Sequence, residues 1–184
     1  MIIGVAGRNG AGKGEVIKLL QARSFSALSL SDAIRDVLRE RGQEESRELM
    51  IDTGRSMREE GGPGVLAERL LTMMKPNGNV AVDSVRHPAE AQALRESGKP
   101  FWLLWVDADE ALRFERIRSR GRSGDPETLE KLRELEGREL ASENPAAQQL
   151  LAVRDIADAH VDNSGDLEHL RSQLAAALED SPLT

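Results

Sequence analysis

Residues 4–16 read GVAGRNGAGKGEV, and this stretch decides the fold. It overlaps a short apolar run, residues 1–6, that predicts a strand, and it leads into a helical pattern over about 13–22. The glycines between them let the backbone turn tightly with its N–H groups facing inward. These groups and the start of the helix form a cradle for polyphosphate anions, and Lys13 adds a positive charge for the outer phosphates. Strand, GxxxxGK loop and helix together are the P-loop arrangement.

The P-loop also predicts which residues contact a nucleotide. They are Gly7, Arg8, Asn9, Gly10, Ala11, Gly12, Lys13, Gly14 and Glu15. One position departs from the general pattern, because Gly14 and then Glu15 stand where a Ser or Thr would hold Mg²⁺. Glu15 either holds Mg²⁺ through a water molecule or is only an anion favoured by the dipole at the helix start. The sequence leaves both interpretations open.

Composition predicts one globular domain. The chain has 184 residues, of which 39% are hydrophobic and 31% charged, enough for a single domain with a real core. No apolar run approaches the roughly 20 residues that span a bilayer, and the early strand leaves no room for a signal peptide. The absence of cysteine excludes disulfides, thiol catalysis and cysteine-bound zinc. We therefore expect a cytoplasmic protein without a membrane partner.

The charge balance bears on partners. A formal net charge of −7 argues against a broad basic surface for nucleic acid. The three histidines show no metal-ligand grouping. No hydrophobic stripe demands a second chain, so we expect a monomer or a weak homodimer whose ligands are small molecules.

Further apolar runs place four more strands along the chain. They are expected at residues 26–30, 79–83, 101–107 and 159–162, with helices between them. Strands that alternate with helices predict an α/β fold, a five-stranded parallel sheet with helices on both faces. Residues 31–74 form a helical insertion with a hinge at 61–64, and residues 116–144 form a short helical lid. We expect a single domain over residues 1–184.

Polar residues follow several of these strands. Asp32, Asp83 and Asn163 each come just after a predicted strand, as the P-loop does. In a parallel sheet the carboxyl ends of the strands share one edge, and ligands bind beyond it. These side chains are therefore predicted to meet at one rim of the sheet.

The chain resembles the nucleoside monophosphate kinase group of P-loop proteins over nearly its whole length. GRNGAGKGE is similar to the adenylate kinase loop GxxGxGKGT, apart from Glu15. SLSDAIRDVL resembles that family's STGDMLR segment, and VAVDSVRHPAEAQAL resembles its LLDGFPRTxxQA segment. ERIRSRGR resembles the start of the family's lid, RIxGRR. The implied fold is the three-layer P-loop NTPase fold, with ATP and Mg²⁺ as cofactors.

The resemblance implies an acceptor site and a metal site. Asp32 and Arg35 match the segment whose arginine holds the acceptor's phosphate. Asp83 matches the aspartate that works near Mg²⁺, and Arg86, one residue early, matches the arginine that grips the acceptor phosphate. Arg58, in the helical insertion, is a further candidate for contacting the acceptor.

The resemblance also implies a donor site that includes the lid. Arg116 matches the arginine stacked on the adenine of ATP, and Arg120 matches a phosphate-binding arginine. Arg138 is a further lid candidate for the acceptor. Asn163 belongs to DNSGDLEHL, which is similar to the loop and helix that close dephospho-CoA kinases beside the adenine. Two longer stretches, DSVRHPAEAQALR and RGRSGDPETLEKLRELEGREL, resemble uncharacterised relatives of those kinases that are well represented in archaea.

The residues themselves argue for phosphoryl transfer, which needs two anions held in line, stabilised charge and excluded water rather than a general base. We expect Lys13, Asp83, Arg86 and Arg120 to be catalytic, with Asp83 and Glu15 near Mg²⁺. Three functions stay open. The first is an ATP-dependent kinase of a (deoxy)nucleoside monophosphate, and the second is a dephospho-CoA kinase-like enzyme. The third is a nucleotide-binding regulator without kinase activity, which the missing P-loop hydroxyl motivates.

Overall fold

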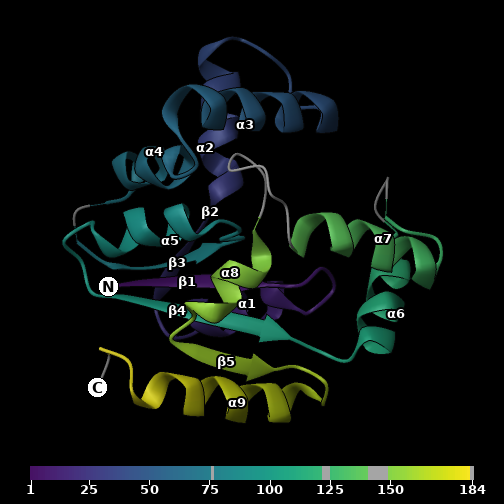
Figure 1. Ribbon diagram of the computed structural model, residues 1–184. Coiled ribbons are helices and arrows are strands. Elements are labelled where there is room, and N and C mark those ends of the chain that lie inside the picture. Colours follow the sequence, from purple (N-terminus) through teal and green to yellow (C-terminus); the bar gives the residue numbers. More distant parts are fainter. Residues whose placement is uncertain (76, 122–124, 141–148, 183–184) are drawn as a thin grey trace.

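The computed structural model describes residues 1–75, 77–121, 125–140 and 149–182. Its strands form one parallel sheet in the order β2-β3-β1-β4-β5 (Figure 1). The strands are β1 (Ile2–Gly7), β2 (Phe25–Ser29), β3 (Asn79–Asp83), β4 (Phe101–Asp107) and β5 (Ala159–Asp162). The predicted five-stranded parallel sheet is therefore confirmed.

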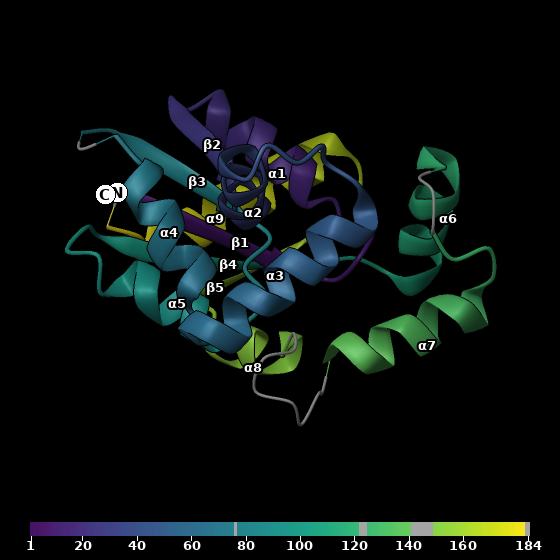
Figure 2. The same cartoon turned by 90° about the horizontal axis from the view of Figure 1, so that it is seen from above.

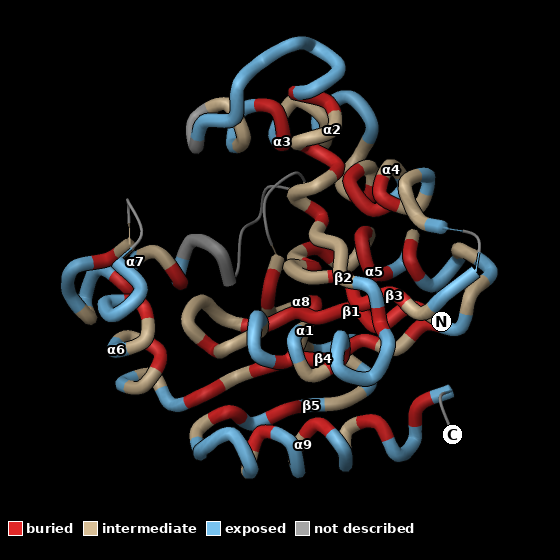
Figure 3. The backbone as a smooth tube through the Cα atoms, turned by 180° about the vertical axis from the view of Figure 1, so that it is seen from behind, coloured by how far each residue is buried: buried red, intermediate tan, exposed pale blue. Residues whose placement is uncertain are grey.

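Strand β1 lies at the centre of the sheet and is buried along its whole length. Ile2 stands opposite Val80 of β3 on one side and opposite Phe101 of β4 on the other. A continuous apolar strand of this kind is typical of a parallel sheet that is covered on both faces. Figure 3 shows β1 and β4 as buried segments inside a shell of more exposed helices.

Helices cover both faces of the sheet, because successive side chains of β1 point to opposite sides. Ile2 packs with α4 (Val65–Met73), α5 (Pro88–Arg95) and α8 (Leu150–Asp155) in one core. Ile3 packs with α1 (Lys13–Gln21) and α9 (Leu167–Glu179) in the other. The three-layer architecture is the P-loop NTPase α/β fold expected from the sequence.

The helical insertion lies at one end of the molecule, at the top of the view in Figure 1. It consists of α2 (Leu30–Glu40), α3 (Arg47–Gly61) and α4. Ser29 caps α2, and Asp32 accepts a hydrogen bond from the Ser29 N–H in return, which forms a capping box. These helices occupy the predicted 31–74 region.

Helices α6 (Glu110–Arg120) and α7 (Leu129–Leu140) lie beyond the carboxyl ends of the strands, set apart from the layers of the sheet (Figure 2). They occupy the region in which the sequence predicts a lid. Residues 122–124 and 141–148, which belong to the same predicted region, lie outside the described residues. Among the described helices, none has the length and apolar character that crossing a membrane requires.

Candidate functional site

The glycine-rich loop has a backbone that only glycine fits at two of its positions. Gly7 has φ +145°, and a Cβ there would lie 2.0 Å from the Val106 carbonyl oxygen of the neighbouring strand. Gly12 has φ +90°, and its Cβ would lie 2.0 Å from the Asn163 side-chain nitrogen. Left-handed backbone and close neighbours thus coincide at these glycines. The loop is packed against β4 and against the turn after β5.

Lys13 begins α1 and is half-buried. Its Nζ donates hydrogen bonds to the carbonyl oxygens of Gly7 and Arg8, both at 2.9 Å. The ammonium group therefore sits over the loop, at the helix N-terminus where an anion is favoured.

A cleft of 1430 Å³ opens beside this loop. The P-loop contributes six lining positions that the sequence predicts as phosphate contacts: Gly7, Asn9, Gly10, Gly12, Lys13 and Gly14, with Glu15 beside them. Strand β3 contributes Asp83 and the loop after it Arg86, whereas α6 contributes Arg116 and Arg120 and the turn after β5 contributes Asn163. The four residues predicted to be catalytic therefore line one cavity. Its volume exceeds the roughly 300–1,000 Å³ of a typical small-molecule pocket, so it has room for more than one ligand.

Asp83 presents a carboxylate oxygen that no other described residue satisfies. The residue ends β3 directly opposite Val5 of β1, and its Oδ1 atom is buried without a hydrogen-bond partner in the described part of the chain. A buried carboxylate oxygen is costly unless a donor or a cation reaches it. Oxygen ligands of this kind suit Mg²⁺, which keeps several waters when it binds. Asp83 therefore fits the predicted metal site.

Glu15 is placed differently. It lines the cleft, but its carboxylate is exposed and forms an ion pair with Lys18 at 2.7 Å, one turn along α1. This pairing matches the interpretation of Glu15 as a helix-start anion, while its place at the cleft keeps the water-mediated contact to Mg²⁺ as a prediction. Among the described residues no group of three or more carboxylate or imidazole side chains is arranged as a metal site.

Arg86 reaches the cleft from the loop between β3 and α5. Its backbone N–H donates to the Glu90 carboxylate at 2.8 Å, and its carbonyl oxygen accepts from the Gln149 N–H at 2.9 Å. No carboxylate of the described residues pairs with its guanidinium. The loop is thus fixed from two sides, and the positive charge is available to a ligand.

The arginines of α6 connect this helix to the nucleotide loop. Arg116 donates to the Asn163 carbonyl oxygen at 2.9 Å, and the Asn163 side chain donates to the Ala11 carbonyl oxygen at 2.8 Å. The second terminal nitrogen of Arg116, Nη1, is buried with no hydrogen-bond partner in the described residues. Arg120, one turn later, donates to the Asn9 side chain at 3.0 Å and to Asp125 at 2.8 Å. Both predicted lid arginines therefore face the P-loop.

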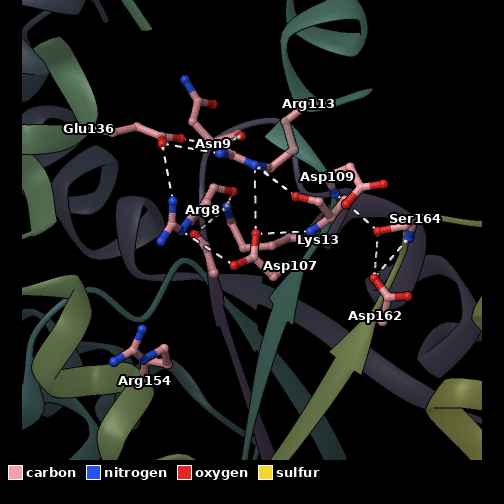
Figure 4. A network of polar contacts seen from close by, with 12 residues as sticks. Arg8, Asn9, Lys13, Asp107, Asp109, Arg113, Glu136, Arg154, Asp162 and Ser164 are labelled. Carbon is pink, nitrogen blue, oxygen red and sulfur yellow. Dashed lines mark hydrogen bonds and ion pairs between the residues drawn. The ribbon is translucent and has the colours of Figure 1, made fainter. Parts of the chain in front are cut away.

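A partly buried ionic network lies beside the loop, and the sequence did not predict it (Figure 4). Arg113 is 1% exposed and pairs with Glu136 of α7, which is 5% exposed. Arg8 lies 3.3 Å from Asp107 and 3.6 Å from Glu136, so its side chain turns toward this network rather than into the cleft. One sequence signal existed for Asp107, because it ends β4 as Asp83 ends β3. No comparable sequence signal marked Arg113 or Glu136.

Three further residues predicted to contact the acceptor, Asp32, Arg35 and Arg58, form ion pairs with other side chains. Arg35 pairs with Asp32 at 2.9 Å and with Glu45 at 3.0 Å, and the hydrogen bond with Glu45 is the main cause that raises the Arg35 pKa. Arg58 pairs with Glu90 at 3.3 Å. The structure does not bring Asp32, Arg35 or Arg58 to the cleft lining. Arg138 belongs to α7, and its side chain lies outside the described residues.

Solved structures similar to this chain share its fold. TT1252 from Thermus thermophilus has a TM-score of 0.61 with 19% identity, covering 97% of this chain and 96% of that one. A shikimate kinase from Bacteroides thetaiotaomicron has a TM-score of 0.57 with 14% identity and covers 97% of both chains. At such identities the likeness establishes the P-loop kinase-like fold alone.

Relatives in sequence establish the family. A UPF0200 protein of Pyrococcus horikoshii is 36% identical over 146 residues, which is 76% of this chain and 78% of that protein. A UPF0200 protein of Methanosarcina mazei is 30% identical over 184 residues, 97% of this chain and 94% of that protein. A family model described as an AAA domain matches residues 3–140. From these matches, the chain belongs to the UPF0200 protein family and to the AAA domain family of that model.

Proposed function

We propose that this protein transfers the γ-phosphate of Mg·ATP to a small phosphorylated acceptor, a nucleoside or deoxynucleoside monophosphate. One observation carries the proposal. Lys13 of the P-loop and the Arg86 guanidinium line the same cleft, with the Asp83 carboxylate also in its wall. Two cationic groups in one cavity suit two anionic substrates brought together for in-line transfer.

The donor half of the cleft supports ATP. The P-loop backbone and Lys13 take the phosphates, as the glycine geometry and the helix N-terminus favour. Arg116, whose buried Nη1 has no hydrogen-bond partner among the residues that the structure describes, and Arg120 add positive charge from α6. Charge that develops on the transferred phosphoryl group is thereby stabilised by groups already in place.

Asp83 is the residue that would hold Mg²⁺, directly or through water, and the metal when bound would neutralise charge on the phosphate oxygens. Side chains of the protein itself orient the acceptor and limit the access of water. Arg86 orients the acceptor anion, and the side chains of Leu132, Leu135 and Leu150 give the cleft an apolar wall that reduces access of water.

The test is ADP release from Mg·ATP across a panel of ribo- and deoxynucleoside monophosphates together with dephospho-coenzyme A. We expect one monophosphate to stimulate ADP release. Lys13→Ala removes the P-loop charge and should abolish the stimulation. The matched control is Lys99→Ala, because Lys99 lies before β4 at the opposite edge of the sheet, where its Nζ donates to the Lys75 carbonyl oxygen.

The outcomes separate the three functions. Stimulation by dephospho-coenzyme A alone would replace the monophosphate by a coenzyme precursor. Binding of ATP without stimulation by any acceptor would overturn the proposal in favour of a nucleotide-binding regulator. A bisubstrate dinucleoside polyphosphate that binds far more tightly than ATP would support a two-nucleotide cleft.

A further inference from the structure

We propose that Glu90 is the positioning residue of the acceptor half of the cleft, acting through the backbone of Arg86 and through Arg58. The inference rests on the proposed function, since it assigns to Glu90 the placement of the group that would hold the acceptor anion. Glu90 itself lies on α5 and is not part of the cleft lining.

Glu90 is a fully buried carboxylate with three donors around it. Its side chain is 0% exposed. Oε2 accepts hydrogen bonds from the backbone N–H groups of Arg86 at 2.8 Å and His87 at 3.1 Å. Oε1 accepts from the Arg58 guanidinium at 3.3 Å. Both oxygens are thereby satisfied, which is the condition for keeping a carboxylate in the interior.

A helix cap alone does not require this arrangement. His87 caps α5, and the Glu90 side chain completes the capping box by accepting a hydrogen bond from the backbone N–H of His87. Asp32 makes the equivalent bond at the start of α2. Asp32 performs that role while its side chain is 32% exposed, so burial is not needed for capping. Glu90 is buried in addition, and it takes a partner from α3, 32 residues earlier in the chain. Burial and the distant partner therefore call for a second role.

The second role concerns Arg86, which belongs to the loop between β3 and α5. The Arg86 N–H donates to Glu90, and the Arg86 carbonyl oxygen accepts from the Gln149 N–H. From this backbone, which is hydrogen-bonded on both sides, the Arg86 residue lines the cleft. Fixing both sides of one residue's backbone limits where its side chain can reach. Small displacements of such a group are expensive in phosphoryl transfer, because the reacting groups need to be held in line.

Arg58 extends the same contact to the helical insertion. It lies on α3, donates to the Gly54 carbonyl oxygen within that helix, and reaches Glu90 across the gap to α5. Met50, on the same helix, lines the cleft. Glu90 thus ties the position of α3 to the loop that presents Arg86, so that both borders of the acceptor half are set by one carboxylate.

The test is a double-mutant cycle on Glu90 and Arg86, read as KM for the stimulating acceptor and KM for ATP. Glu90→Gln keeps the size of the side chain and removes its charge. We expect it to raise the acceptor KM about tenfold or more while the ATP KM stays within about twofold. Because Glu90 acts in part through Arg86, the Arg86→Met, Glu90→Gln double variant should raise the acceptor KM by less than the product of the two single effects, and the remainder reports the contribution through Arg58. Additive effects, or equal effects on both KM values, would overturn the proposal.

The control variant is Asp36→Asn. Asp36 accepts from Arg69 at 2.8 Å and joins α2 to α4, so its loss also breaks an ion pair between helices of the insertion. Among the described residues, the ion-pair partners of Asp36 are Arg39 and Arg69, and neither belongs to the Arg86 loop. We expect the acceptor KM to remain within about twofold of the native value. A rise as large as that of Glu90→Gln would show that general loosening of the insertion is sufficient, and would overturn the positioning role.

A second measurement needs no acceptor and separates this proposal from the proposed function. Hydrogen exchange of the amides of Arg86 and His87 reports directly on their bonds to Glu90. We expect both amides to exchange faster in Glu90→Gln, with the amides of β1 unchanged. Should no acceptor stimulate ADP release, the proposed function fails while this result still supports Glu90 as the group that fixes the loop. Unchanged exchange at both amides would overturn the positioning role whatever the activity.

Discussion

Arg113 of α6 and Glu136 of α7 form a buried ion pair, and the same guanidinium donates to the Asn9 carbonyl oxygen in the P-loop at 3.2 Å. Arg113 also donates to the Ala108 carbonyl oxygen at 3.0 Å. One side chain therefore joins α7, the start of α6 and the nucleotide loop, in the interior where competing water is excluded (Figure 4).

Removal of Glu136 is expected to destabilise the fold strongly. Glu136→Ala removes the nearer of the two carboxylates that pair with buried Arg113 and leaves Asp107, whose Oδ1 lies 3.6 Å from the Arg113 Nε. Breaking a buried pair costs about 3–5 kcal/mol in comparable sites, and we expect a loss toward the lower end because Asp107 remains. The measurement is the free energy of unfolding by chemical denaturation. Glu168→Ala is the matched control, because Glu168 pairs with Arg171 in an exposed pair on α9 and its loss should leave the unfolding midpoint nearly unchanged. Equal effects of the two variants would contradict the structural role of the buried pair.

Alanine substitutions at two neighbouring glycines should shift stability in opposite directions. At Gly12 the new Cβ meets the Asn163 side chain and the backbone is left-handed, so Gly12→Ala is expected to lose roughly 1–3 kcal/mol. At Gly14 nothing lies within 4 Å of the new Cβ, and the residue is helical, so Gly14→Ala should gain up to about 1 kcal/mol. Thermal and denaturant unfolding measure both. A loss at Gly14 as large as that at Gly12 would mean that this glycine has a conformational role that its surroundings do not indicate.

Gly14 also allows the missing hydroxyl to be restored. The open space at this position accommodates the side chain of Gly14→Ser without displacing a neighbour. A hydroxyl there stands where other P-loops hold Mg²⁺, so we expect the variant to need less Mg²⁺ for half-maximal nucleotide binding. The measurement is nucleotide affinity against Mg²⁺ concentration, with Gly14→Ala as the variant of similar size without a hydroxyl. Identical Mg²⁺ curves for the two variants would contradict a metal near residue 14.

The pH dependence of stability should reveal Glu90. Burial raises the pKa of its carboxyl above the ordinary value of 4.5, against the opposing effect of Arg58. The folded chain thus keeps this proton to higher pH than the unfolded chain does. The stabilising contribution is complete below pH 4.5 and is lost as the pH rises through the folded pKa. Relative to Glu90→Gln, the native protein should therefore lose stability from pH 4.5 toward neutral. A stability difference that stays constant over this range would contradict the raised pKa.

Local sequence predicted the sheet and the P-loop because the signals for them are local. The apolar run of β1 and the glycines before Lys13 act within a few residues, and the order of strands and helices allows few topologies. The rule that the carboxyl ends of parallel strands share one edge predicted that the P-loop, Asp32, Asp83 and Asn163 meet there, and all of these except Asp32 line the cleft. These parts of the site needed no knowledge of side-chain partners.

The sequence could not predict which carboxylate each arginine pairs with, because tertiary packing brings the partners together. Arg58 meets Glu90, and Arg113 meets Glu136, across 32 and 23 residues respectively. Periodicity places such side chains on a helix face but does not say which carboxylate faces them. Arg35 illustrates the result, since its resemblance to an acceptor-binding arginine stays a prediction while Glu45 and Asp32 occupy its guanidinium.

The order of the strands has an evolutionary consequence. Strand β1 carries the P-loop, and its two neighbours lead to different residues of the cleft region: β3 leads to Asp83 and Arg86, whereas β4 leads to Asp107 and the arginines of α6. In the proposed function the first group borders the acceptor and the arginines of α6 border the nucleotide. Replacement of segments between β2 and α5 changes what borders the acceptor half without altering the contacts that α6 makes with the P-loop. Divergence within the family can therefore alter acceptor preference separately from nucleotide binding, so that related chains with the same P-loop need not share a substrate.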